Sequence, residues 1–136
     1  MTVYSYAIAT FAAGTGALAN LETLTGLTRP PHSIFTLYPV EYTGGDGRTV
    51  GDGQPTCTWT FDSLSQAQVN ALRAFVLSGA TYLQSASVYI TTRKDDGTYS
   101  NFLAWLHWPR DFHTKRVLGG YYEGIEITFT NLVQQA

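Results

Sequence analysis

The residues that could carry out acid–base or nucleophilic chemistry are few and scattered along this sequence. The histidines are His32, His107 and His113, and none of them lies in a recognisable catalytic motif. A nucleophile needs a neighbouring base to activate it, and there is no Gly-x-Ser-x-Gly elbow that would indicate a serine hydrolase. We therefore expect the protein not to be an enzyme, and we predict no catalytic residues.

Metal and cofactor sites are not indicated either, because a metal needs several His, Cys, Asp or Glu side chains that converge. Asp46 and Asp52 lie in a glycine-rich stretch that lacks the alternating ligands and closing glutamate of a calcium loop. The same glycines lack the Lys-Ser or Lys-Thr ending of a phosphate-binding loop. Glu123 and Glu126 are three apart on an expected strand, so they should point to opposite faces and form no acid–base pair. The sequence thus predicts no metal and no cofactor.

The composition indicates one β-rich domain. The chain has 136 residues, of which 44% are hydrophobic, 13% charged and 14% aromatic. These values exclude a disordered chain and a coiled coil, and abundant aromatics and threonines favour strands. A net charge of −2 without a basic block argues against direct sequence-specific nucleic-acid binding. So many aromatic residues in a small chain also suggest that partners cover part of the surface.

Cysteine usage and hydropathy restrict the cellular setting. Cys57 is the single cysteine, so no intramolecular disulfide can form, and we expect a small buried side chain on a strand. No apolar run approaches the roughly 18–20 residues of a membrane span. The N-terminus lacks the basic start of a secretory signal. We expect the chain to fold in a cytoplasm-like compartment.

Alternating apolar residues predict most of the strands that would position these groups. The clearest is 56–61, in which Cys57, Trp59 and Phe61 share one face. Lys94 to Gly97 carries the Asp-Gly signal of a tight hairpin, whereas the glycines of 44–53 predict a mobile turn region. The other expected strands cover 3–10, 33–42, the stretch around 88–90, 98–108 and 121–132.

One segment has the pattern of a helix, expected from Gln66 to Ser78. Ser65 can cap its first turn and Gln68 completes a capping box. Gly79 stands just past the end, where a left-handed residue often terminates a helix. The apolar face at helical spacing, which we expect to pack on the sheet, consists of Val69, Leu72, Phe75 and Val76.

These elements predict a mainly β fold with one helix: an antiparallel β-barrel or sandwich with a flanking α-helix. A single domain spans residues 1–136, with a flexible arm at 11–31 and a loop at 44–55. The arm region carries Leu18, Leu21 and Leu24 at three-residue spacing. This spacing fits either a short core helix or an arm that docks on a neighbouring subunit.

The basic residues gather in one loop. Arg110, Lys115 and Arg116 are three of only eight lysines and arginines, and they lie between two expected strands. Such a cluster is either a solvated loop or a salt-bridging contact with a neighbouring subunit. Together with Leu18, Leu21 and Leu24, these residues form the candidate interface.

The order of segments resembles a known group of proteins. The Gly-Asp-Gly-Arg stretch at 45–48 is followed by a strand, TCTWTFDSL, and by a helix, SQAQVNALRAFVL. An aromatic hairpin follows, and the last strand reads GIEITFTNL. This pattern resembles the small minor tail and distal tail ring proteins of long-tailed bacteriophages, of the lambda minor tail protein M kind. The resemblance covers roughly residues 40–133, and the first forty residues depart from it.

The resemblance implies a structural virion protein in the tail, assembled in the host cytoplasm. It would form a ring, usually a hexamer, at the distal end of the tail and link the tail tube to the tip. Its partners would be further copies of itself, the tail tube protein and the tail hub or tip proteins. A tip ring, a tube subunit and a tail terminator all remain open, because the first forty residues differ.

A second function class fits the composition, namely a small β-barrel module that binds a ligand or carbohydrate. Its binding platform would consist of aromatic residues near two strand ends: Trp105, Trp108, Tyr121 and Tyr122. An enzyme with unrecognised motifs is the least favoured class, since no nucleophile–base pair is visible.

Overall fold

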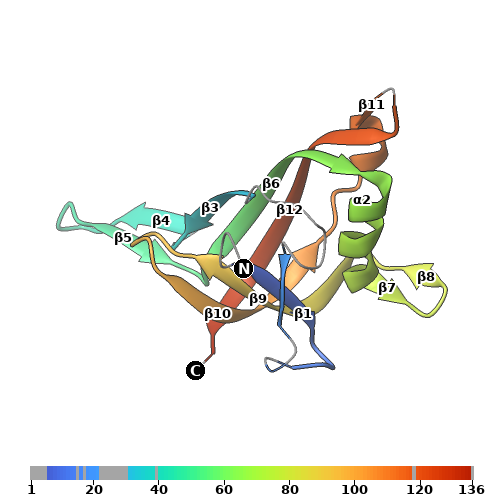
Figure 1. The fold of residues 1–136 in the computed structure, drawn as a ribbon. Helices are drawn as coiled ribbons and strands as arrows, with labels where there is room; N and C mark the ends of the chain where they lie inside the picture. Colours follow the sequence, from blue (N-terminus) through green and yellow to red (C-terminus); the bar gives the residue numbers. More distant parts are fainter. Residues whose placement is uncertain are drawn as a thin grey trace.

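A single curved antiparallel sheet makes up most of the computed structural model (Figure 1). The structure describes residues 6–14, 16, 18–21, 31–38, 40–117 and 119–135. The sheet has eight strands in the order β2-β1-β9-β10-β12-β6-β3, with β11 also paired to β12. Their bounds are Ala7–Thr10 (β1), Ala19–Asn20 (β2), His32–Thr36 (β3), Thr56–Ser65 (β6), Ser85–Arg93 (β9), Tyr99–His107 (β10), Arg116–Val117 (β11) and Tyr121–Gln134 (β12).

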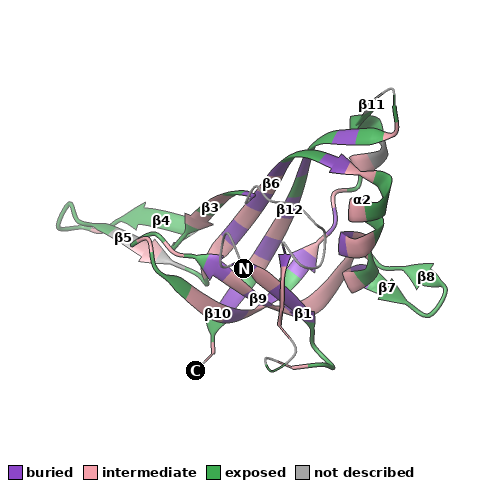
Figure 2. Ribbon diagram, viewed as in Figure 1, coloured by how far each residue is buried: buried purple, intermediate pink, exposed green. Residues whose placement is uncertain are grey.

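The predicted fold class is confirmed: the chain is mainly antiparallel β with one short α-helix in its described part. The sheet is not closed, so the architecture is that of an open barrel or sandwich with a flanking helix. Alternation along β6 is as predicted, because Cys57, Trp59 and Phe61 are buried and the threonines between them are half-buried. Figure 2 shows buried positions recurring along β6 and β12.

The interior is held together by contacts that cross the curve of the sheet. The Tyr6 hydroxyl lies 2.6 Å from the Ser33 hydroxyl, which brings the residue before β1 to the edge strand β3. The Trp59 indole N–H donates to Thr92 Oγ1 at 3.0 Å, from β6 to β9. The Trp59 ring packs edge-on against Phe129 of β12, with centroids 4.7 Å apart. The core therefore includes one buried polar contact whose donor and acceptor are both satisfied.

The helix α2 (Gln66–Arg73) begins as predicted and ends earlier than predicted. Ser65 caps it, and the Gln68 side chain accepts a hydrogen bond from the Ser65 backbone N–H, which completes the capping box. Val69 and Leu72 are buried against the sheet, as is Val76 in the 3-10 turn that follows, whereas Phe75 is only half-buried. The apolar face is thus confirmed.

The predicted end of the helix at Ser78 is wrong. A 3-10 turn (Ala74–Val76) follows α2, and Leu77 is extended, with ψ 126°. A small hairpin then begins, formed by β7 (Leu77–Ser78) and β8 (Thr81–Tyr82). Gly79 does have a positive φ of 61°, but it serves the two-residue turn of this hairpin and does not terminate the helix.

The single strand predicted over 33–42 is also wrong, because it is two strands in different sheets. After β3, a separate hairpin consists of β4 (Val40–Thr43) and β5 (Thr49–Asp52). It includes nearly all of the region 44–53 that was expected to be a mobile turn, and its turn is closed by a hydrogen bond from the Gly44 N–H to the Arg48 carbonyl at 2.7 Å. Pro39 lies outside the described residues. The hairpin projects from one end of the sheet (Figure 1).

The region 11–31 is described only in part. Leu21 follows β2 and is fully buried, with 0% exposure, whereas Leu18 is half-buried and Leu24 lies outside the described residues. Leu21 therefore packs in the core, as one of the two alternatives predicted, and does not belong to a docking arm. It is no longer a candidate interface residue.

Candidate functional site

The histidines and the cysteine lie on separate elements. His32 is exposed on β3, and the His107 ring nitrogen Nε2 lies 2.8 Å from Thr130 Oγ1 on the neighbouring strand. His113 lies in the 3-10 turn Phe112–Lys115. Cys57 is a free, buried thiol beside Thr92. Burial raises the pKa of the Cys57 thiol, so it is not activated as a nucleophile.

Among the described residues, no three His, Cys, Asp or Glu side chains gather in a way that could hold a metal ion. The expectation that Glu123 and Glu126 face opposite sides of the sheet is wrong. Gly124 between them has a positive φ of 70°, and the buried residues Tyr122 and Ile125 are three apart. The alternation shifts at this glycine, and both glutamates are exposed.

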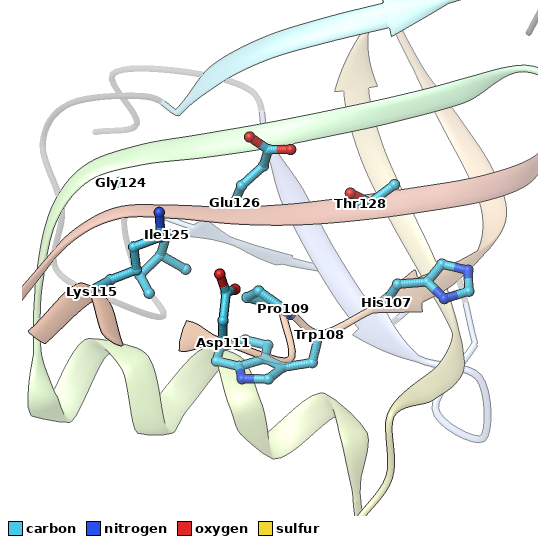
Figure 3. Close-up of a pocket in the computed structure, with 9 residues that line it drawn as sticks. All are labelled: His107, Trp108, Pro109, Asp111, Lys115, Gly124, Ile125, Glu126 and Thr128. Carbon is cyan, nitrogen blue, oxygen red and sulfur yellow. The ribbon is translucent and has the colours of Figure 1, made fainter. Parts of the chain in front are cut away.

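A cleft of about 330 Å³ lies between the end of β10, the 3-10 turn and the middle of β12. Figure 3 shows the side chains of Asp111 and Lys115 directed toward β12, and the carboxylate of Glu126 directed away from Asp111. The residues that line the cleft are His107, Trp108, Pro109, Asp111, Lys115, Gly124, Ile125, Glu126 and Thr128. Because both charge signs occur there, the cleft suits the mixed polar groups of a protein surface better than a single ion.

The predicted basic loop is exposed, and the structure only partly brings it together. Arg110 precedes the 3-10 turn, Lys115 ends it and lines the cleft, and Arg116 begins β11. In the described part of the chain the ion pair that forms joins Arg48 and Asp46, at 3.8 Å, and involves none of these three cations. Their charges are therefore available to another molecule.

The aromatic platform of the alternative function is not assembled. Trp108 and Tyr122 are buried, with 4% and 6% exposure, while Trp105 and Tyr121 are exposed. Trp108 packs on Phe112 with centroids 5.6 Å apart, and Phe112 stacks on Tyr122. Half of the predicted platform thus belongs to the packing between sheet and 3-10 turn.

Two projecting hairpins carry exposed apolar side chains that the sequence reasoning missed. On β4, Val40 and Tyr42 are 56% and 54% exposed. On and after the β7–β8 hairpin, Leu77, Tyr82 and Leu83 are exposed as well. A signal was present for the first hairpin: Val-Glu-Tyr-Thr and Thr-Val flank the glycine-rich turn, which is the pattern of two short strands.

Comparison with models of known protein families, with characterised proteins and with solved structures finds no significant match. In the described part of the chain, no helix has the length and hydropathy needed to cross a bilayer. The surface geometry is therefore the main guide to function.

Proposed function

We propose that this protein is a structural subunit that assembles with copies of itself into a ring at the distal end of a phage tail, linking tube to tip. The observation that carries the proposal is the β4–β5 hairpin, which projects from the sheet and is exposed along all of β4 (Figure 2). A hairpin that packs on little of its own subunit, yet carries Val40 and Tyr42, is suited to bind another molecule.

Burial of Val40 and Tyr42 against a second copy of the chain would contribute favourable free energy to association. Burying an apolar side chain of this size contributes about 1.5–3 kcal/mol, and the hairpin is already folded, so its ordering cost is low. Next to it, β3 pairs with β6 on one side only among the described residues. The unpaired edge of β3, where Ile34 is exposed, offers backbone donors and acceptors to a second chain.

The position in a phage tail comes from the resemblance of the segment order to minor tail and distal tail ring proteins. Such a ring would stack on the tail tube protein on one side and on hub or tip proteins on the other. The open sheet with one flanking helix is compatible with this class, and its exposed edges and hairpins supply surfaces for lateral and axial contacts.

Sedimentation velocity and electron microscopy of the purified protein test the proposal. We expect a concentration-dependent closed oligomer, and we expect Val40→Ser/Tyr42→Ser to shift it toward monomer while the melting temperature stays within about 2 °C. Val133→Ser is the matched control, since it removes an exposed apolar side chain from the end of β12. A parent protein that stays monomeric at all accessible concentrations contradicts the proposal.

A further inference from the structure

The last residue of α2, Arg73, contacts the faces of two aromatic rings. Its guanidinium carbon lies 4.0 Å from the centroid of the Tyr82 ring and 4.6 Å from that of Phe112. Tyr82 comes from β8 and Phe112 from the 3-10 turn after β10, so three separate elements build this site. Both rings hold the guanidinium by cation–π contacts, and its N–H donors determine what else it can bind.

Two buried N–H donors at this site lack acceptors in the described part of the chain. The Nε of Arg73 is buried without a hydrogen-bond partner in the described part of the chain, and so is the indole Nε1 of Trp108, which packs on the same Phe112 ring. Arg73 also has no ion pair among the described residues. A half-buried guanidinium without a counter-charge is costly, and a carboxylate is the group that its fork of N–H donors fits best.

We propose that Arg73, Tyr82 and Phe112 form a receptor for a carboxylate of a second copy of this chain, and that this carboxylate is Glu41. The proposal rests on the proposed self-assembly and names the contact that would carry it. Glu41 is exposed on β4, between the exposed side chains of Val40 and Tyr42.

Two other exposed carboxylates already have partners within the subunit. Asp46 pairs with Arg48 at 3.8 Å. Asp96 accepts hydrogen bonds from the Thr98 backbone N–H and hydroxyl at 3.0 and 2.7 Å, which hold the pKa of Asp96 below its usual range. Glu41 has no such internal partner among the described residues.

The positions of Glu41 and of the Arg73 site in the fold favour a ring. Figure 1 shows the β4–β5 hairpin at one end of the molecule and α2 with the β7–β8 hairpin at the other. A contact between different patches of neighbouring copies is heterologous, and it generates a closed ring when the rotation between copies closes. Exposed Leu77 and Leu83 near Tyr82 would pack on the apolar side chains of the incoming hairpin and exclude water from the ion pair.

Charge reversal tests the pairing. Arg73→Glu and Glu41→Arg should each raise the dissociation constant of the oligomer at least tenfold in sedimentation experiments. The double variant, and an equimolar mixture of the two single variants, should return it to within about threefold of the parent, because opposite charges meet again in both cases. Asp95→Arg is the matched control for Glu41→Arg, with the same charge change at an exposed turn, and should leave the constant unchanged.

The outcomes separate this pairing from the proposed function. If the parent protein assembles and the reversals have no effect, or the double variant is not rescued, the Arg73–Glu41 pairing is wrong and self-assembly stands. If the parent never assembles, the proposed function fails first and the pairing fails with it. Should Arg73→Glu not fold, Arg73→Gln replaces it. Glu41 lies on an exposed hairpin, so Glu41→Arg should fold. If this variant alone does not weaken assembly, the pairing is wrong.

Discussion

At the scale of single residues, the most constrained group is the polar contact inside the core. Thr92 is fully buried on β9, and its hydroxyl accepts the indole N–H of Trp59 and lies 3.5 Å from the sulfur of Cys57. We expect Thr92→Val, which keeps the shape but removes the acceptor, to lower the free energy of unfolding by about 1–3 kcal/mol. Thr58→Val, at a half-buried position on β6 whose side chain has no hydrogen bond among the described residues, is the control. Urea denaturation monitored by tryptophan fluorescence measures both, and equal losses would contradict the role of Thr92.

The thiol of Cys57 makes stability depend on pH in the alkaline range. Burial raises the pKa of Cys57 in the folded state, outweighing the hydrogen bonds from Thr92 and Trp59, which act in the opposite direction. The unfolded state therefore loses its thiol proton first as pH rises above about 8.5, and stability falls there by up to about 1.4 kcal/mol per pH unit. Below that pH the contribution is fully present. Cys57→Ala should remove this slope between pH 8.5 and 9.5 in urea titrations, and an unchanged slope would assign it to other groups.

At the scale of elements, the start of α2 depends on its cap. The Ser65 hydroxyl accepts a hydrogen bond from the Gln68 N–H at 3.3 Å, and Gln68 Oε1 accepts one from the Ser65 backbone N–H at 2.8 Å. Ser65→Ala should cost about 1 kcal/mol of stability. Ser63→Ala, at an exposed position two residues earlier on β6, should cost close to nothing. Thermal or urea unfolding of the two variants side by side checks the difference, and equal stabilities would show that the cap contributes little.

The same elements show what the sequence could and could not predict. Local chemistry was sufficient for the cap at Ser65 and for the hairpin at Gly97, because both depend on residues within four positions of each other. The end of α2 could not be predicted from the apolar face, since Val76 continues the helical spacing although it already lies in the 3-10 turn that leads into β7. The split of 33–42 into β3 and β4 depends on which strand each half pairs with, and this is a long-range property.

For the candidate site, the limits of sequence reasoning are similar. The exposure of Lys115 and Arg116 can be predicted from the polarity of their loop. The burial of Leu21 cannot, because it depends on the pairing of β2 with β1. The site around Arg73 brings together residues 73, 82 and 112. Their spacing has no period, so only the folded chain reveals that they meet.

At the scale of the whole molecule, the proposed assembly would use two surfaces at opposite ends of the subunit and a basic loop between strands. The β4–β5 hairpin and the Arg73 site would join neighbours within a ring. The loop that holds Lys115 and Arg116 lies beside the cleft of mixed charge and is free of ion pairs in the described part of the chain. Charges of this kind set the register and choice of partners more than they add affinity.

This last feature leads to a prediction for assembly. Lys115→Glu/Arg116→Glu should leave the melting temperature unchanged, because exposed charges contribute about 0–1 kcal/mol to folding. The same variant should weaken ring formation or stacking at low salt, and the deficit should shrink at moderate salt because screening shortens the range of the charges. Sedimentation at about 30 and 150 mM salt measures this. Arg93→Glu/Lys94→Glu supplies the same charge change on the β9–β10 hairpin. If both double variants assemble like the parent at both salts, the loop is simply solvated; if both fail equally, net charge and not this loop controls assembly.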